Sequence, residues 1–362
     1  FDMNNLDADK EYFLIIEFLQ PADRPWAEKG FVQMREQLPV KSATPYAPIV
    51  SGAGKSVKIN ESAEGITVSG DGFKIVFDDG TGSIYTLNYN GKDYITPGNG
   101  PRLDAYRAPV DNDVWVYSQW YAAGLDNLKH KASDRKTFTR PDGSVVISYK
   151  VESQAPSETR LDDKFTSGRA RLIAGDNLDD NALRFITNQI WTVYPDGSVE
   201  LEAAVTDNKP AMTLPRLGYA MKLPSYLENY TYYGRGPVNN FNDRKTSQFV
   251  GLYDSKVADM FVGFPKPQSM SNREEVRWSS LRDNDGNGLQ FIALDTMSMS
   301  VLPWSEKQLA NAPHPCDLPA SDGNWLHLDT KVTGLGGSSC GQGGPLSHDR
   351  VKGGNHHFGF II

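Results

Sequence analysis

Hydrophobic positions recur mainly at every second residue along this chain. Segments 65–79, 190–205, 288–304 and 324–332 alternate apolar with polar or small residues, and Gly, Pro, Asp or Asn bound them. A period of two is typical of strands with one buried face, because successive side chains on a strand point to opposite faces. The pattern therefore predicts a mainly β protein with large antiparallel sheets.

Two predicted hairpins share one turn sequence, "PDGSV", at 141–145 and 195–199. An Asp-Gly pair between β-rich flanks supplies the positive φ that a tight hairpin needs. Helical signals are few. Segment 113–128 has apolar residues at near-helical spacing, with Asp113 as a candidate N-cap and Gly124 as a stop.

The first 45 residues form a separate region. Two strand-like segments, 11–20 and 29–40, precede a stretch rich in Pro, Ser, Ala and Gly. A lone hairpin cannot bury enough area to be stable. We therefore expect residues 1–45 to be the last hairpin of a β-sandwich plus a linker, and residues 50–362 to form the main domain.

Composition excludes some classes of function. The net charge of -8 is spread over 362 residues without a Lys/Arg stripe, which predicts no nucleic-acid partner. The longest apolar runs are strand-sized, which predicts no membrane span. Cys316 and Cys340 could be free thiols or a disulfide, and no Cys/His cluster suggests zinc. The chain opens at Phe1 without an initiator Met, as expected of a piece of a longer protein, and the compartment stays open between periplasmic, secreted and cytoplasmic.

The stretch 232–249, "YYGRGPVNNFNDRKTSQF", has the look of a glycine-rich phosphate loop. A dinucleotide-binding loop needs a third glycine where Asn239 stands, and a helix must follow. Two interpretations remain. The loop is an asparagine-buttressed turn with a buried Asp243–Arg244 contact, or its side chains hydrogen-bond a polyol, with Arg235 and Asn239 as further candidates.

Three other features carry alternatives. Arg107, Asp111, Asn112 and Asp113 form either an N-cap with local ion pairs or a buried polar network that holds a domain interface or a cleft. Segment 282–288 resembles the first half of a calcium loop, but Leu294 stands where the bidentate acid belongs, which favours a turn. Trp191 and Trp278 are core residues or sugar-stacking platforms.

Taken in order, several motifs resemble the C-terminal part of the large β-galactosidases of glycoside hydrolase family 2. They are "RAPVDNDVW" (107–115), "YPDGSVELEAAV" (194–205), "LPRLGYAMKLP" (214–224), "YYGRGPVNNFNDRKTSQFVGLY" (232–253), "PQSMSNREEVRW" (267–278) and "GNWLHLDTKVTGLGG" (323–337). The resemblance runs from about residue 50 to the end. The first 40 residues are similar to the end of the immunoglobulin-like domain that precedes this part in the family.

The resemblance implies a large antiparallel β-supersandwich like that of galactose mutarotases, and a parent enzyme that hydrolyses terminal β-D-galactosides with retention. It places the catalytic glutamates and magnesium ligands on a (β/α)₈ barrel, for which this sequence shows no αβ alternation. We therefore expect this chain to be non-catalytic, without a cofactor of its own. We expect it to wall the active site, pack on the barrel and contact carbohydrate, as part of a possible homo-oligomer.

One family loop departs from its pattern here. The stretch "GGSSCG" (336–341) offers Ser339 and Cys340 as candidate sugar contacts, and it has Gly341 where the family's best-known members carry a tryptophan. Two alternatives stay open for the chain as a whole. It is a carbohydrate-binding module for galactose-containing glycans, or an aldose-epimerase-like enzyme, which needs a histidine base facing a carboxylate.

Overall fold

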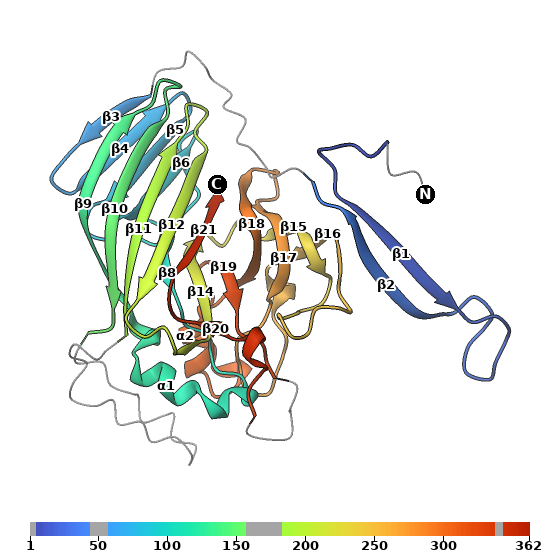
Figure 1. Cartoon of the computed structure of the whole chain (residues 1–362). Coiled ribbons are helices and arrows are strands. Elements are labelled where there is room, and N and C mark those ends of the chain that lie inside the picture. The colour runs from blue at the N-terminus through green and yellow to red at the C-terminus, as the bar shows by residue number, and fades with distance from the viewer. Residues whose placement is uncertain (1–4, 44–56, 157–182, 337–342) are drawn as a thin grey trace. The chain divides into compact units, whose positions relative to one another are not determined.

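The computed structural model describes residues 5–43, 57–156, 183–336 and 343–362, and the chain divides into two compact units, Phe1–Ile49 and Val50–Ile362 (Figure 1). In the first unit, β1 (Tyr12–Leu19) pairs antiparallel with β2 (Val32–Lys41), as the sequence predicts. Large apolar side chains such as Phe18 and Met34 are about half exposed on this pair of strands. Its assignment to an immunoglobulin-like sandwich stays a prediction.

The second unit is built on antiparallel sheets. The large sheet has 12 strands: β8 (Arg102–Asp104), β9 (Lys129–Thr139), β10 (Val145–Gln154), β11 (Arg184–Val193), β12 (Val199–Asp207), β14 (Arg216–Leu223), β15 (Asn229–Gly236), β16 (Phe249–Lys256), β17 (Arg273–Arg282), β18 (Gly288–Leu302), β19 (Asn324–Val332) and β21 (His356–Ile361). A five-stranded sheet comprises β3 (Lys58–Glu61), β4 (Gly65–Gly70), β5 (Phe73–Asp78), β6 (Ser83–Tyr89) and β7 (Lys92–Asp93), and β13 (Thr213–Leu214) pairs with β20 (Val351–Lys352). The prediction of a mainly β protein with a large antiparallel sheet is confirmed.

The two larger sheets pack face to face at one end of the unit. Trp191 of β11 is fully buried and packs edge-on against Phe77 of β5, with 5.6 Å between the ring centroids. Its Nε1 donates to the Gly82 carbonyl at 3.0 Å. Trp191 is therefore a core residue, because a ring with no exposed surface cannot stack on a sugar.

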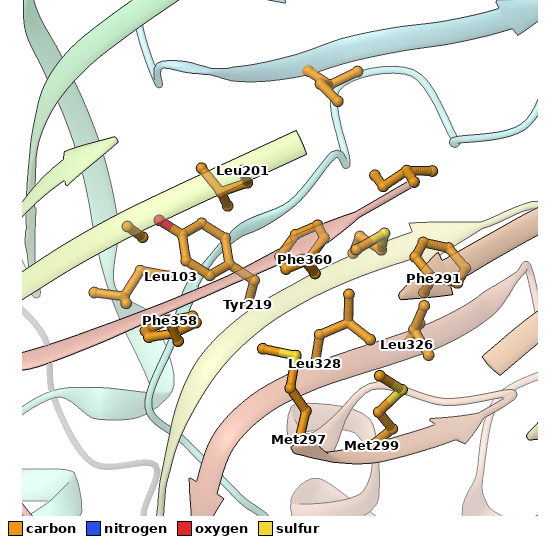
Figure 2. Packing of buried hydrophobic residues seen from close by; sticks show 14 of the residues in the cluster. Leu103, Leu201, Tyr219, Phe291, Met297, Met299, Leu326, Leu328, Phe358 and Phe360 are labelled. Atoms are coloured by element: carbon orange, nitrogen blue, oxygen red, sulfur yellow. The ribbon is translucent and has the colours of Figure 1, made fainter. Parts of the chain in front are cut away.

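The large sheet forks at β18. The first half of β18 pairs with β21, at Ile292 and Ile361, and its second half pairs with β19, at Met299 and Leu328. The β14–β19 branch and β21 face each other across apolar side chains, and Tyr219 of β14 meets Phe358 and Phe360 edge-on (Figure 2). This packing continues the core from the two-layer region toward β15 and β17.

Both predicted "PDGSV" hairpins are confirmed. They connect β9 to β10 and β11 to β12, and Gly143 (φ 86°) and Gly197 (φ 94°) take the positive φ that the turn requires.

The two adjacent histidines of β21 point to opposite faces of the strand, as successive side chains on a strand do. His357 is exposed, His356 is half-buried, and the residues that follow them are buried.

The helix predicted over 113–128 is only partly correct. The segment folds as η1 (Asp111–Trp115), α1 (Tyr117–Ala122) and η2 (Leu125–Asn127). Asp113 does not cap α1, because it lies inside η1 with its carboxylate bound elsewhere, whereas Gly124 (φ 67°) follows α1 as a left-handed stop. The remaining described helices are α2 (Glu306–Asn311), η4 (Ala258–Met260), η5 (Pro315–Asp317) and η6 (Ser347–Asp349), and none in the described part of the chain is long and apolar enough to cross a bilayer.

Candidate functional site

A buried ion pair fixes the segment before α1. Arg107 and Asp113 are at most 1% exposed, and the guanidinium donates to both carboxylate oxygens, from Nη2 at 2.6 Å and from Nε at 3.1 Å. The same guanidinium donates to the backbone carbonyls of Thr333 and Gly334, and the Val110 amide donates to Asp113 at 3.0 Å. The motif is therefore a local ion pair that is also part of a buried polar network, while the Asp111 side chain is exposed, and the motif's role at a domain interface or a cleft stays a prediction.

The neighbouring polar residues extend this network to more of the segment 333–335, which follows β19. Asn112 donates from Nδ2 to the Leu335 carbonyl at 3.0 Å, and the Asp111 amide donates to Oε1 of Gln268 at 3.2 Å. Thr333, which follows β19, also donates from its hydroxyl to the Leu214 carbonyl. Residues 333–335 are thereby fastened from two sides.

Asp243 of the "YYGRGP" stretch completes the arrangement. Its carboxylate accepts from the Leu335 amide at 3.1 Å and from the Gly336 amide at 2.7 Å. A Cβ on Gly334 would lie 2.5 Å from the Asp243 carboxyl carbon, so this close approach requires glycine. We call Arg107, Asn112, Asp113 and Asp243 the anchor cluster, because three of these side chains bind residues 333–336 and the fourth, Asp113, holds Arg107 in place.

The chain is also held on the other side of residues 337–342. The Arg350 guanidinium lies 4.5 Å from the Trp115 ring, and its Nε donates to the Pro345 carbonyl at 2.7 Å. Asn242 donates to the Asp349 carboxylate at 3.1 Å, next to Asp243 of the anchor cluster. Residues 337–342 themselves, with the candidates Ser339 and Cys340, lie outside the described residues.

Arg235 is tied into a charged group rather than projecting freely. Its Nε lies 2.8 Å from Glu275, its Nη1 donates to the Gln248 carbonyl at 2.8 Å, and Lys245 lies 3.1 Å from the other Glu275 oxygen. Burial alone would raise the pKa of Glu275, but the hydrogen bonds from Arg235 and Lys245 outweigh it and lower that pKa. These side chains are about a quarter exposed.

The predicted Asp243–Arg244 contact is wrong. Arg244 is exposed, and the Asp243 carboxylate accepts instead from the Leu335 and Gly336 amides. Asn239 is half-buried, and its Oδ1 has no hydrogen-bond partner among the residues that the structure describes. The neighbouring Asn240, not Asn239, buttresses the turn, since its Nδ2 donates to the Arg235 and Val238 carbonyls.

Sequence reasoning missed Glu274, which is 6% exposed at the start of β17. Its Oε1 accepts from Asn272 at 2.7 Å and from Ser298 at 2.9 Å, while burial raises its pKa to about 7. The residues on either side of the stretch 272–274, Ser271 (φ 72°) and Glu275 (φ 53°), adopt the left-handed conformation, which costs non-glycine residues about 1 kcal/mol or more each. The only sequence signal was two adjacent acids at the head of an apolar strand.

A second missed network lies under the branch of the sheet. Arg216 is fully buried and pairs with Glu306 and Asp329 at 2.9 Å each. Burial raises the pKa of Asp329 to about 6, against the lowering effect of Arg216. Nearby, His327 Nδ1 lies 3.2 Å from Asp104, the pairing that an epimerase-like site would need, but His327 is only 5% exposed.

Two smaller features have structural roles. In the calcium-like segment, Asp283 pairs with Lys92 at 2.6 Å and accepts from the Asp285 and Asn287 amides, as expected of a turn. No group of three or more His, Cys, Asp or Glu side chains is placed to hold a metal ion in the described part of the chain. Cys316 is exposed, and its pairing with Cys340 lies outside what the structure describes.

The comparisons with known proteins support the resemblance to β-galactosidases. The family model described as "Beta galactosidase small chain" matches residues 69–362. A β-galactosidase from Priestia megaterium is 26% identical over 92% of this chain, and one from Halalkalibacterium halodurans is 25% identical over 99%. The chain spans 29% and 33% of the lengths of these two relatives.

Solved structures resemble the chain only weakly. A putative aldose 1-epimerase from Escherichia coli covers 85% of this chain over 98% of its own length, at 11% identity and a TM-score of 0.39. A likeness of that size adds nothing to the assignment. The family model, by contrast, covers most of the chain and ends at its last residue. The chain belongs to the β-galactosidase small chain family.

Proposed function

We propose that this chain is the non-catalytic wall of a β-galactosidase active site, acting as one part of a longer enzyme that hydrolyses terminal β-D-galactosides with retention. The observation that supports it best is the anchor cluster. A fully buried ion pair from one segment and the half-buried Asp243 carboxylate from another hold residues 333–336, on one side of the loop that the family resemblance places beside the sugar. Burying an ion pair is a costly way to gain stability, but it fixes geometry.

In this proposal the chain supplies positioning and shape, and the chemistry comes from elsewhere in the enzyme. The catalytic glutamates and the magnesium site belong to the catalytic barrel implied by the family resemblance. Asp243 is a positioning residue, since it acts through the backbone amides of Leu335 and Gly336. The proposal also assigns β1–β2 to the end of an immunoglobulin-like sandwich, because its apolar faces need covering.

The test is Asp243→Asn in the full-length product of the encoding gene. The amide retains one acceptor oxygen, so one of the two backbone bonds to Leu335 and Gly336 is lost. We expect kcat/KM for a β-galactoside to fall ~10-fold, because small misplacements near a reacting centre are expensive. Binding of the sugar should weaken along with it, which steady-state measurement of KM and kcat separately will show.

The matched control is Asp207→Asn. Asp207 also accepts from two backbone amides, Lys209 at 2.7 Å and Gly354 at 2.6 Å, but neither bond involves the anchor cluster or residues 333–336. Both variants should lose similar stability, whereas only Asp243→Asn should lose activity. Equal activity in the two variants would show that the anchor cluster has a structural role alone.

A further inference from the structure

The outward face of β15, β16 and β17 carries a row of aromatic and apolar side chains. Tyr233 of β15 pairs with Leu252 of β16 and with Trp278 of β17, so the three side chains lie side by side on one face. Leu252 is 61% exposed, and both rings are half-buried. The neighbouring Tyr230 and Tyr232 point to the opposite face and belong to the core.

The next row on the same face is polar. Thr231 pairs with Asp254 and Ser280, one two-residue repeat or roughly 7 Å along the strand from the aromatic row. Its hydroxyl donates to Oδ1 of Asp254 at 2.6 Å and accepts from Nη2 of Arg282 at 2.8 Å. A carboxylate and a guanidinium are thus held on either side of one hydroxyl.

This polar row borders an open pocket of ≈ 590 Å³. Its lining side chains include Asp254, Asp259, Lys256, Arg282 and Asn284. With Asp283 the lining holds three acids against two bases, and Asp283 is already paired with Lys92 at 2.6 Å, so the pocket disfavours an anionic ligand and suits a neutral one better. The guanidinium has five donor hydrogens and the carboxylate accepts only, so together they serve hydroxyl groups that both donate and accept.

We propose that this face binds a neutral oligosaccharide, with one sugar ring over Trp278 and Tyr233 and the next in the pocket beside Asp254 and Arg282. A sugar ring has an apolar face of C–H groups, which packs on an aromatic ring, and an edge of hydroxyls, which needs paired donors and acceptors. The binding site uses none of the anchor cluster. It goes beyond the proposed wall function, since it retains a glycan on the surface of this chain.

Isothermal titration of the 362-residue chain with a β-1,4-linked galactotetraose tests the proposal, and tetragalacturonate serves as the charged comparison. Wild type should bind the neutral tetrasaccharide in the millimolar range or tighter, and should bind the charged one more weakly. Trp278→Ala should weaken binding ~10-fold, because it removes the central aromatic ring on which the sugar packs. Asp254→Asn should weaken it by a similar factor, because a hydrogen bond to a charged group is lost.

Two variants on the same sheet serve as controls. Phe138→Ala removes an exposed ring on β9, and Glu152→Gln neutralises an exposed carboxylate on β10, and both should bind as wild type does. Absence of heat from wild type would overturn the proposal, and so would binding by Trp278→Ala and Asp254→Asn that is as tight as that of wild type. These outcomes leave the wall function untouched, because that function is read from kcat/KM in the full-length enzyme.

Discussion

Glu274 is a buried acid whose pKa, about 7, stands well above its ordinary 4.5 because of burial. The folded protein then holds a proton that the unfolded chain releases near pH 4.5. The free energy of unfolding should therefore fall as pH rises from about 5 to 8, with Glu274 contributing up to about 3 kcal/mol of that fall.

Glu274→Gln tests this titration. The Gln oxygen accepts the same bonds from Asn272 and Ser298 without ionising. The variant should match wild type near pH 5 and exceed it in stability near pH 8, as measured by urea unfolding. Glu152→Gln, at an exposed position, is the control. A variant that is less stable than wild type at pH 8 would show that the ionised carboxylate is the stabilising form.

Asp113 is also a buried acid, but unlike Glu274 it forms an ion pair, with Arg107 at 2.6 Å. Asp113→Asn leaves the Arg107 charge buried without its counter-ion, which should cost about 3 to 5 kcal/mol. The exposed Asp317, 3.2 Å from His314, offers a matched control, and Asp317→Asn should change the melting temperature very little. Similar losses from the two substitutions would contradict a buried, rigid pair.

At the scale of elements, the glycines of "YYGRGP" allow two strands to approach. A Cβ on Gly234 of β15 would lie 2.8 Å from the Cα of Val276 in β17. Gly234→Ala should therefore destabilise the protein by roughly 1 to 3 kcal/mol through overpacking. Gly263 has no heavy atom within 4 Å of such a Cβ, so Gly263→Ala should leave the denaturation midpoint unchanged. Tolerance of alanine at 234 would mean that the strands separate easily.

The periodicity of the sequence predicted strands and turns better than it predicted which side chains pair with one another. The two "PDGSV" hairpins follow from local turn chemistry, and alternation marks β11 and β12 correctly. The helix over 113–128 was overextended, because the Asp113 carboxylate is taken by Arg107 instead of capping α1. Arg216 and Asp329 were missed, since β14 and β19 are buried on both faces and alternation there no longer separates core from surface.

For the candidate site, the sequence pointed to the side chains that make the contacts but not to the residues that they contact. Arg107, Asn112, Asp113 and Asp243 were singled out by composition, yet the partners of Arg107 at Thr333 and Gly334 are more than 220 positions away. Contacts at that separation depend on the whole sheet order, which turn and strand signals do not encode. The family resemblance showed that these segments belong to one domain, and the structure showed which of their residues are in contact.

At the scale of the whole molecule, the proposed function gives this chain the role of shaping the active site and leaves catalysis to another part of the enzyme. The family match covers residues 69–362, while the relatives are about three times as long as this chain. We therefore expect the anchor cluster to matter for activity only where a catalytic region is present.

The most direct test compares the 362-residue chain with the full-length product of the encoding gene on a chromogenic β-D-galactoside. We expect enzyme-like turnover by the full-length protein and none above background by the chain alone, even when circular dichroism shows that the chain is folded. Turnover by the isolated chain at rates comparable to the full-length protein would contradict this expectation.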